Sequence, residues 1–350
     1  LALEQRIMVY KQSRKSISCY DQTYQLPELK KEFPEFTRIG SQCLQDVLNR
    51  LDKAYKAFFR RVKCGQKPGF PRFKSSDRYN SFTLSQSGWK LGGRYLELSK
   101  IGRLKLYLDR PIEGKVKTVT ISRSKTGKWF VSFSCDEVLV KQFPETNKEV
   151  GIDVGIKSFL VDSDGKQVDN PLFLKQSLDE LRVKQRSLSR KVRGSNRRKE
   201  SKLQVVKLYE KITNQKQDFL HKTANYYIWN YGRIYIEDLK INNMIRNKHL
   251  SRSISDSSWG NFFQMLSYKA EEAGRVLVKV NPRGTSQKCS RCNRDVLKSL
   301  AIRIHNCPHC GLTLDRDLNA ALNIKRSGQD HRTSTWGDVS PSVVRESLSV

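Results

Sequence analysis

The chain has 350 residues, of which 66 are Lys or Arg and 35 are Asp or Glu, so its formal net charge is +31 at pH 7. This excess of cations predicts a polyanionic partner, with nucleic acid as the first candidate, and the length predicts two or three domains that each bury a core. The sequence has no run of about 18 apolar residues and no apolar signal-like start, which argues against a membrane protein and favours the cytosol.

The first elements expected along the chain are helical and basic. Residues 1–11, LALEQRIMVYK, are expected to form a helix, and residues 41–64 carry apolar side chains at helical spacing. The stretch that follows, residues 65–74, is rich in Gly and Pro, which break helices. Four basic residues in or next to this loop form a candidate nucleic-acid surface. They are Lys63, Lys67, Arg72 and Lys74.

From about residue 80 the chain shows short alternating runs that predict a small antiparallel β-barrel. The runs are NSFTLS, RYLELS, RLKLYL, VKTVTIS and KWFVSFS, separated by Gly, Asp, Pro and Ser turns. Trp129 and Phe130 lie in the last run. Aromatic side chains in strands are more often core residues, so we expect both in the core, with base stacking on nucleic acid as the alternative.

An α/β domain is expected to follow the polar residues 144–148. Residues 149–165 predict two strands joined by a Gly turn, 179–230 are mostly helical, and apolar strands are expected within 232–239 and 275–280. Residues 182–202 hold ten basic residues and one acidic residue. Phosphates would neutralise that many like charges, so a nucleic-acid face is favoured over a solvated helix. The residues assigned to this face are Arg190, Lys191, Arg193, Arg197 and Arg198.

The spacing of four cysteines predicts a metal site. Cys289 and Cys292 form one Cys-x-x-Cys pair, and Cys307 and Cys310 form a second. Two such knuckles complete a closed tetrahedral Zn²⁺ site of structural type. A redox or disulfide role is the alternative. Neither His305 nor His309 is expected to be a ligand, since four thiolates fill the site.

Three carboxylates are candidates for a second site. Asp153 and Glu237 each end an apolar strand, so both are expected at strand ends of one sheet. Asp317 precedes a helix-like stretch, where its alternative role is capping or pairing with the helix dipole. If the three cluster, they are a ligand set for Mg²⁺. A pair of such ions activates water and stabilises the leaving oxygen of a phosphodiester.

The motifs resemble those of the TnpB/OrfB proteins of insertion sequences, relatives of type V CRISPR effectors and of eukaryotic Fanzor proteins. The resemblance covers most of the chain. It rests, in order, on QDVLNRLDKAYKAFFRRVKCGQKPGFPRFK, GKWFVSFS, GIDVGIKSF, YIEDLKINNM, GTSQKCSRC, CPHCG and DRDLNAALNI.

The resemblance implies a multidomain α/β fold plus a β-barrel. The implied parts are a helical recognition region (1–65), an oligonucleotide-fold-like wedge barrel (66–148), a RuvC nuclease domain of RNase H type (149–284) with a basic helical insertion (170–230), an inserted four-cysteine zinc ribbon (285–312), a final RuvC helix (313–326) and a flexible C-terminal tail (327–350). Family members begin with a strand that completes the wedge barrel. The chain opens on Leu1, so we expect that strand to be missing.

The resemblance also implies an activity and its residues. The first RuvC aspartate falls on Asp153, the glutamate on Glu237 and the last aspartate on Asp317, with Asp315 as runner-up, and the ribbon would place that last aspartate at the site. The implied function is a transposon-encoded, RNA-guided DNA endonuclease of the prokaryotic cytoplasm, associated with the nucleoid. Its implied cofactors are structural Zn²⁺, catalytic Mg²⁺ and a guide RNA from the transposon end, and its target is DNA. The alternatives are a regulator of transposition that does not cleave, and a resolvase-type nuclease without a guide.

Overall fold

The computed structural model describes residues 1–139, 143–299 and 302–335. The chain divides into two compact units, Leu1–Leu139 and Val140–Val350. Each unit has its own core, and each is described by itself below.

The first unit begins with helices, as the sequence predicted. They are α1 (Ala2–Ser13), α2 (Cys19–Tyr24), α3 (Leu26–Glu32) and α4 (Ser41–Lys63). The expected helices at residues 1–11 and 41–64 are therefore confirmed. A side-chain hydrogen bond joins α4 to the strand that follows it, because the backbone N–H of Thr83 donates to Asp46 Oδ2 at 3.0 Å.

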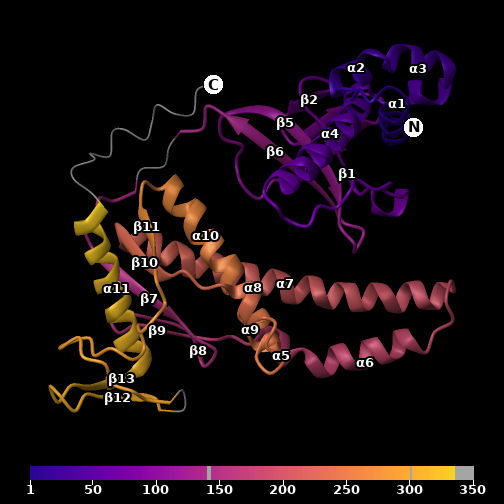
Figure 1. The fold of residues 1–350 in the computed structure, drawn as a ribbon. Helices are drawn as coiled ribbons and strands as arrows, with labels where there is room; N and C mark the ends of the chain where they lie inside the picture. Colours follow the sequence, from indigo (N-terminus) through magenta and orange to yellow (C-terminus); the bar gives the residue numbers. More distant parts are fainter. Residues whose placement is uncertain (140–142, 300–301, 336–350) are drawn as a thin grey trace. The chain divides into compact units, whose positions relative to one another are not determined.

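The strands of the first unit form two small antiparallel sheets (Figure 1). One has the order β1 (Ser81–Leu84), β5 (Lys115–Arg123), β6 (Trp129–Asp136), and the other has β2 (Trp89–Gly92), β3 (Tyr95–Leu98), β4 (Gly102–Lys105). Leu84, Leu96 and Val119, from three different strands, belong to one buried cluster that both sheets share. The antiparallel strands are thus confirmed. In the described residues the strand pairing stays within each sheet, so a closed barrel remains a prediction.

The expectation that Trp129 and Phe130 are core residues was wrong, since 63% of Trp129 and 50% of Phe130 is exposed. Trp129 pairs with Arg123 at the tip of the β5–β6 hairpin, one residue beyond Ser122, the partner of the first residue of β1, Ser81. Val131, two residues along the same face, does pack against the core. The tip therefore reaches past the buried cluster, and the guanidinium carbon of Arg123 lies 5.6 Å from the Trp129 ring centroid.

The second unit is built on a five-stranded mixed sheet. Its order is β11 (Val276–Val280), β10 (Arg233–Glu237), β7 (Glu149–Val154), β8 (Ser158–Asp162), β9 (Gln167–Asp169). Strands β7, β10 and β11 run parallel, whereas β8 and β9 are antiparallel to their neighbours. The helices are α5 (Phe173–Gln176), α6 (Leu178–Ser189), α7 (Asn196–Asn230), α8 (Ile241–Met244), α9 (Ser251–Ser257), α10 (Trp259–Glu272) and α11 (Arg316–Thr335).

Helices cover both faces of this sheet (Figure 1). Ile234 and Ile236 of β10 pack in one cluster with α7 and α10, whereas Tyr235 between them packs with Ile324 of α11. This alternation follows from the two-residue period of a strand. Odd-numbered residues of β10 therefore face α11.

Two glycines allow α11 to lie close to the sheet. A Cβ on Gly151 of β7 would overlap the Ala321 carbonyl oxygen and the backbone of Lys325, and a Cβ on Gly328 of α11 would overlap the Tyr235 ring. The close packing of α11 on β7 and β10 thus depends on the lack of a side chain at each of these glycines. The helix continues to Thr335, past residue 326 where the final helix was expected to end. Residues 336–350 of the expected tail lie outside the described residues.

Helices α6 and α7 form a long hairpin (Figure 1). Leu181 of α6 packs with Val205, Leu208 and Ile212 of α7 in a buried cluster of its own. The hairpin falls within the basic insertion expected at 170–230. Across the described ranges, no helix combines the length and apolar character that a membrane crossing needs.

Candidate nuclease centre and zinc ribbon

Strand periodicity and helix placement bring three carboxylates to one face of the sheet. Asp153 shares the face of Gly151 on β7, and Glu237 shares the face of Tyr235 on β10, so both face α11. The two strands are parallel neighbours in which Ile236 pairs with Ile152, which places the next residues, Glu237 and Asp153, side by side. The expected position of both at strand ends of one sheet is therefore met.

The third carboxylate, Asp317, lies in the first turn of α11. Ala321 of this helix lies against Gly151, and Asp317 is one turn, or about 6 Å, earlier along the helix axis. Asp153 is two residues, or about 6.6 Å, beyond Gly151 along β7. The turn that carries Asp317 therefore reaches the level of Asp153. The negative charge of Asp317 acts on Asp153 in agreement with this placement.

The two aspartates of the DRD segment have different surroundings. Asp315 Oδ1 accepts the backbone N–H of Asp317 at 2.7 Å and that of Leu318 at 3.3 Å, so Asp315 caps α11. The side chain of Asp317 is 16% exposed and pairs with Arg316 at 3.1 Å and with Arg303 at 3.6 Å. Asp315 therefore shapes the helix entry and Asp317 is held by two arginines, while the charges of both act on Asp153, that of Asp317 more strongly.

The cluster is electrostatically unfavourable without a cation. Burial raises the pKa of Asp153 well above its ordinary value, and the charges of Glu237 and Asp317 raise it further. Burial also raises the pKa of Glu237, and a hydrogen bond from Thr285 opposes that rise. Since a nearby positive charge favours the ionised form of each carboxyl, this oxygen set fits a hard divalent cation such as Mg²⁺.

The three carboxylates are nevertheless less tightly gathered than the cysteines. In the described part of the chain, the cysteine quartet is the group of His, Cys, Asp or Glu residues whose ligand atoms all lie within 4.8 Å of one another. Like charges repel, and both oxygens of Asp317 are drawn to arginines, Oδ1 to Arg316 and Oδ2 to Arg303. The three side chains therefore lie on the same side of the sheet without all their oxygens falling within 4.8 Å of one another.

The four cysteines fit a zinc ion. The Cys289 and Cys310 sulfurs are 3.6 Å apart, as are those of Cys292 and Cys307. Four Zn–S bonds of about 2.3 Å in a tetrahedron place sulfur atoms about 3.8 Å apart, so the observed spacing matches. All four are free thiols, and a disulfide needs about 2.05 Å between sulfurs. The cluster could therefore bind zinc, and its geometry disfavours the disulfide alternative.

Each cysteine pair is shaped by its local backbone. The residue after the second cysteine has a positive φ in both knuckles, 60° at Asn293 and 70° at Gly311. Asn and Gly are the residues that tolerate this conformation best. The backbone N–H of each then donates 2.9 Å to the carbonyl of the first cysteine, Cys289 or Cys307. This tight turn points both sulfurs of a pair to one side.

The second knuckle leads directly into α11. It lies in the loop between β12 (Ile304–Asn306) and β13 (Thr313–Asp315), which pair antiparallel with Ile304 opposite Asp315. The backbone N–H of Arg316 then donates to the Arg303 carbonyl at 2.7 Å. The ribbon therefore sets where α11 begins.

Comparison with known proteins identifies the family. The family model described as "Probable transposase" and named for OrfB of IS605 matches residues 131–248, and "Cas12f1-like, TNB domain" matches residues 259–324. A Streptomyces pristinaespiralis protein named as an RNA-guided DNA endonuclease is 34% identical over 93% of this chain and 82% of its own length. InsQ of Escherichia coli K12, named likewise, is 33% identical over 82% of this chain and 74% of its own length. The chain belongs to the TnpB/OrfB family of insertion-sequence proteins.

The TnpB/OrfB chain also resembles a solved structure. The structure of a Cas12f1–sgRNA–target DNA complex matches 93% of this chain and 81% of its own, with a TM-score of 0.55 and 17% identity. At this identity the match speaks for the fold alone. It agrees with the multidomain α/β fold expected from the sequence.

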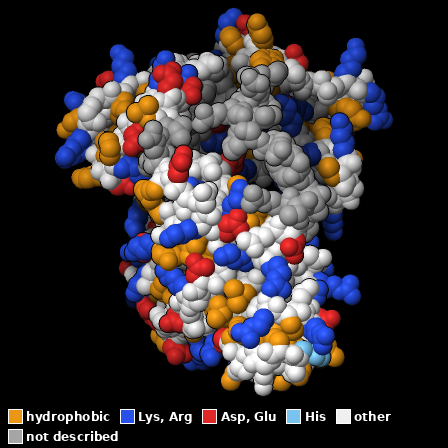
Figure 2. Space-filling model, turned by 90° about the vertical axis from the view of Figure 1, so that its left-hand side faces the viewer, with side chains coloured by type: hydrophobic (Ala, Val, Ile, Leu, Met, Phe, Trp, Pro, Cys, Tyr) orange, Lys and Arg blue, Asp and Glu red, His pale blue; other side chains and the backbone are white. Residues whose placement is uncertain are grey.

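The basic residues singled out in the TnpB/OrfB chain lie on two surfaces, one in each unit. Lys63, Lys67, Arg72 and Lys74 are exposed at the end of α4 and in the following loop. The tip of the α6–α7 hairpin carries exposed Arg190, Arg193 and Arg197 and half-buried Lys191. Figure 2 shows Lys and Arg side chains spread over the face that it draws, with acidic and hydrophobic side chains between them.

Arg198 differs from its basic neighbours. Its Nη1 donates to the carbonyls of Leu188 and Lys191, both at 2.9 Å, and its side chain is half-buried. The Leu188 carbonyl lies in the last turn of α6, where it also accepts the Lys191 N–H at 3.2 Å, and the Lys191 carbonyl lies just past the end of the helix. Arg198 therefore holds the turn between α6 and α7, a role that spacing along the sequence could not indicate.

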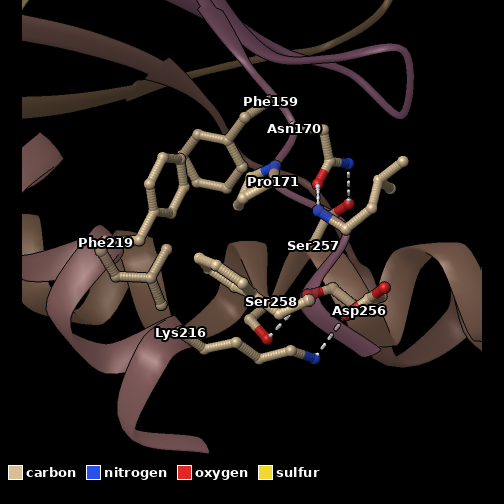
Figure 3. A pocket seen from close by; sticks show the side chains of 11 residues that line it. Phe159, Asn170, Pro171, Lys216, Phe219, Asp256, Ser257 and Ser258 are labelled. Atoms are coloured by element: carbon tan, nitrogen blue, oxygen red, sulfur yellow. Dashed lines mark hydrogen bonds and ion pairs between the residues drawn. The ribbon is translucent and has the colours of Figure 1, made fainter. Parts of the chain in front are cut away.

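A polar cluster that the sequence did not reveal borders a small pocket of the second unit (Figure 3). The side chain of Asp256 in α9 is 5% exposed, accepts the backbone N–H groups of Leu174 and Lys175 and lies 2.7 Å from Lys216 Nζ of α7. Phe159 and Phe219 line the apolar side. Asp256 thus joins α9, which follows the Glu237 strand, to α5 and α7 of the basic insertion.

Proposed function

We propose that the chain is a transposon-associated, RNA-guided DNA endonuclease in which Asp153, Glu237 and Asp317 form a Mg²⁺-dependent centre of RuvC type. Its relatives named as RNA-guided DNA endonucleases support guided cleavage of DNA. One observation carries the assignment of the centre. Carboxylates from β7, β10 and α11 lie on one side of the sheet, where the charges of Glu237 and Asp317 act on half-buried Asp153.

The architecture around the centre supports an RNase H-type domain. The sheet is mixed, has helices on both faces and presents two carboxylates at the ends of neighbouring parallel strands. We assign residues 149–284 and 313–326 to this domain, with a helical insertion at 170–230 and a zinc ribbon at 285–312. The helices and two sheets of the first unit suit the helical region proposed for 1–65 and the wedge barrel proposed for 66–148.

The residues of the proposed centre have distinct tasks. Bound Mg²⁺ would supply an activated water and stabilise the leaving oxygen of the phosphodiester. Asp153 and Glu237 would hold the metal from the sheet and Asp317 from the helix. Arg316 and Arg303 lie against Asp317 and neutralise part of its charge before metal binds. Cys289, Cys292, Cys307 and Cys310 would hold Zn²⁺ and so keep the start of α11 in position.

The basic surfaces suit the proposed partners, a guide RNA from the transposon end and a DNA target. In guided enzymes base pairing reads the sequence, so the protein needs contacts to the nucleic-acid backbone. Lys and Arg supply such contacts without base specificity. The exposed Arg190, Arg193 and Arg197 at the α6–α7 tip, and the loop that carries Lys67 and Arg72, are the surfaces proposed for this purpose.

The test is cleavage programmed by the RNA that the protein carries. The chain is expressed with its transposon end, purified, and its bound RNA is sequenced. We expect a defined RNA, and Mg²⁺-dependent cutting of a plasmid only when the plasmid matches the variable end of that RNA. Asp153→Ala is the matched control, which should bind RNA and DNA and not cut.

Other outcomes separate the competing functions. Cutting of plasmids regardless of their match to the RNA would favour a nuclease without a guide. RNA-dependent binding to the matched plasmid without cutting by the wild-type chain would favour a regulator of transposition. Cutting that survives in Asp153→Ala would refute the proposed centre.

A further inference from the structure

We infer that Thr285 is a positioning residue for Glu237, and that a polar strap from α11 through Thr285 sets the Glu237 carboxylate relative to Asp317. The strap consists of Thr285, Lys288, Ser290, Asn319 and Asn323. The inference rests on the proposed function, because it concerns the metal-holding role of Glu237.

The contact at the centre of the strap is short and partly buried. Thr285 is 5% exposed, and its Oγ1 lies 2.6 Å from Glu237 Oε1 and 3.1 Å from the Pro282 carbonyl oxygen. A hydroxyl has one proton to donate, and the charged, closer acceptor takes it more strongly. Within the described residues Thr285 is the hydrogen-bond donor to this carboxylate, and it binds Oε1, which leaves Oε2 to serve as a metal ligand.

Two buried asparagines of α11 fix the backbone around Thr285. Asn323 Nδ2 donates to the Thr285 carbonyl at 2.8 Å and to the Lys288 carbonyl at 2.7 Å. Asn319 Nδ2 also donates to the Lys288 carbonyl at 2.8 Å, and its Oδ1 accepts the Ser290 N–H at 2.9 Å. The asparagines are four residues apart and so share one face of the helix.

In this arrangement the single helix α11 positions two carboxylates. Asp317 lies on α11 itself, and Asn319 and Asn323 of the same helix hold the segment whose Thr285 hydroxyl orients Glu237. Buried polar side chains are costly unless their hydrogen bonds are made. Here the bonds go to the backbone of Thr285, which contacts Glu237, and to that of Lys288 and Ser290, on either side of Cys289. Partners of metal ligands typically change metal affinity by about 10- to 100-fold when they are lost.

The competing interpretation is that the strap only holds the ribbon in place. Thr285→Val removes the hydroxyl at nearly constant shape, Thr285→Ser keeps it, and Thr313→Val is a matched control. Thr313 lies in the ribbon, where its hydroxyl donates to Asn306 at 3.3 Å in an exposed position. Zinc content and melting temperature report on the ribbon. The Mg²⁺ concentration for half-maximal cleavage, and the rise in melting temperature on adding Mn²⁺ without nucleic acid, report on the metal centre.

If Thr285 positions Glu237, Thr285→Val should need about 10-fold more Mg²⁺ and show a smaller Mn²⁺-induced rise in melting temperature. It should keep one zinc per chain and normal DNA binding. Thr285→Ser and Thr313→Val should behave like wild type. In a Glu237→Ala background, adding Thr285→Val should leave the Mn²⁺ response unchanged, because the group it positions is gone.

A Thr285→Val protein with wild-type Mg²⁺ and Mn²⁺ responses would overturn the inference. If Thr285→Val loses zinc or unfolds, Thr285→Cys takes its place, since a thiol is a weaker donor of similar size, and an unchanged Mg²⁺ requirement there would overturn the inference equally. Wild type and Asp153→Ala are run in the same series. A wild type that does not cut with its guide would contradict the proposed function. A wild type that cuts, together with a Thr285→Val protein whose Mg²⁺ and Mn²⁺ responses are unchanged, would contradict the inference alone.

Discussion

Asp315 accepts the backbone N–H of Asp317 at 2.7 Å, so one aspartate of the DRD segment holds the other in place. Asp315 occupies the position before the first helical residue, where a short acidic side chain caps the exposed N–H groups of the first turn. Asp317, two residues later, is the aspartate proposed for the centre, and its charge acts on Asp153 more strongly than that of Asp315. The same residue type therefore has a local task at one position and a task in the proposed centre at the other.

Replacing each aspartate should separate the two tasks. Asp317→Ala should lower cleavage by at least about 100-fold, because a metal ligand contributes several kcal/mol of charge stabilisation. Asp315→Ala should instead lower the free energy of unfolding by about 1 kcal/mol, the usual value of a lost helix cap, and keep most of the activity. Cleavage rates and melting curves on the same preparations measure both effects.

Asp315→Asn is the control for the cap, since Asn caps helices about as well as Asp. It should match wild type in stability. Cleavage that survives Asp317→Ala and disappears in Asp315→Ala would exchange the roles of the two residues.

Local patterns were sufficient to predict the parts of the site that depend on spacing along the chain. The period of two in a strand places Asp153 and Glu237 on one face once their strands are recognised, and the knuckle spacing of Cys289 and Cys307 with their partners needs no tertiary information. Both features are set within a few residues of sequence. The structure agrees with both placements.

Other features depend on contacts between distant segments and could not be read from the sequence. Trp129 is exposed because β1 begins opposite Ser122, one residue short of the Arg123–Trp129 pair, which depends on strand pairing and not on the residues of β6 itself. Thr285 and Arg198 look like ordinary loop and helix residues until Glu237 and the end of α6 are seen beside them. Likewise, only the close packing of α11 on the sheet explains why glycine is needed at positions 151 and 328.

The raised pKa of Asp153 predicts an unusual dependence of stability on pH. Its ordinary value is 3.8, and burial followed by the charges of Glu237 and Asp317 raises the folded value. Between the two values the native state binds more protons than the unfolded state, so the free energy of unfolding falls as pH rises through this interval. Below the ordinary value both states are protonated and the effect vanishes.

Asp153→Asn should therefore be more stable than wild type at about pH 8 in Mg²⁺-free buffer, and the difference should shrink toward about pH 4. Added Mg²⁺ should raise the melting temperature of wild type more than that of the variant, because a cation relieves the repulsion. Glu145→Gln, at an exposed position, is the control and should follow wild type at every pH. Equal melting temperatures of wild type and Asp153→Asn across this range would contradict the electrostatic account.

Zinc should be required for the start of α11. Metal analysis of the purified chain should find one zinc per molecule, and Cys289→Ser or Cys307→Ser should lose it and lower the melting temperature of the second unit. Cleavage should fall as well, because the ribbon hairpin continues directly into the helix that carries Asp317. Cys135→Ser, on β6 of the first unit, should retain the zinc and the activity. A wild-type chain that is folded and free of metal would contradict the zinc assignment.

The tip of the α6–α7 hairpin should contribute to nucleic-acid affinity through charge alone. Reversing Arg190, Lys191, Arg193 and Arg197 to Glu should weaken binding of every sequence alike and flatten the dependence of log K on log salt. Each lost phosphate contact on a duplex reduces that slope by about 0.9. Titrations at several salt concentrations measure it.

Arg198→Ala separates charge from structure at the same tip. Arg198 donates to two carbonyls at the end of α6, so its loss should lower the melting temperature and leave the salt slope nearly unchanged. A slope that falls as much in Arg198→Ala as in the reversed variant would mean that the turn itself, and not its exposed charges, makes the contact. A slope that stays unchanged in the reversed variant would leave the hairpin tip as a solvated surface, and the loop with Lys63, Lys67, Arg72 and Lys74 would then be the surface to reverse next.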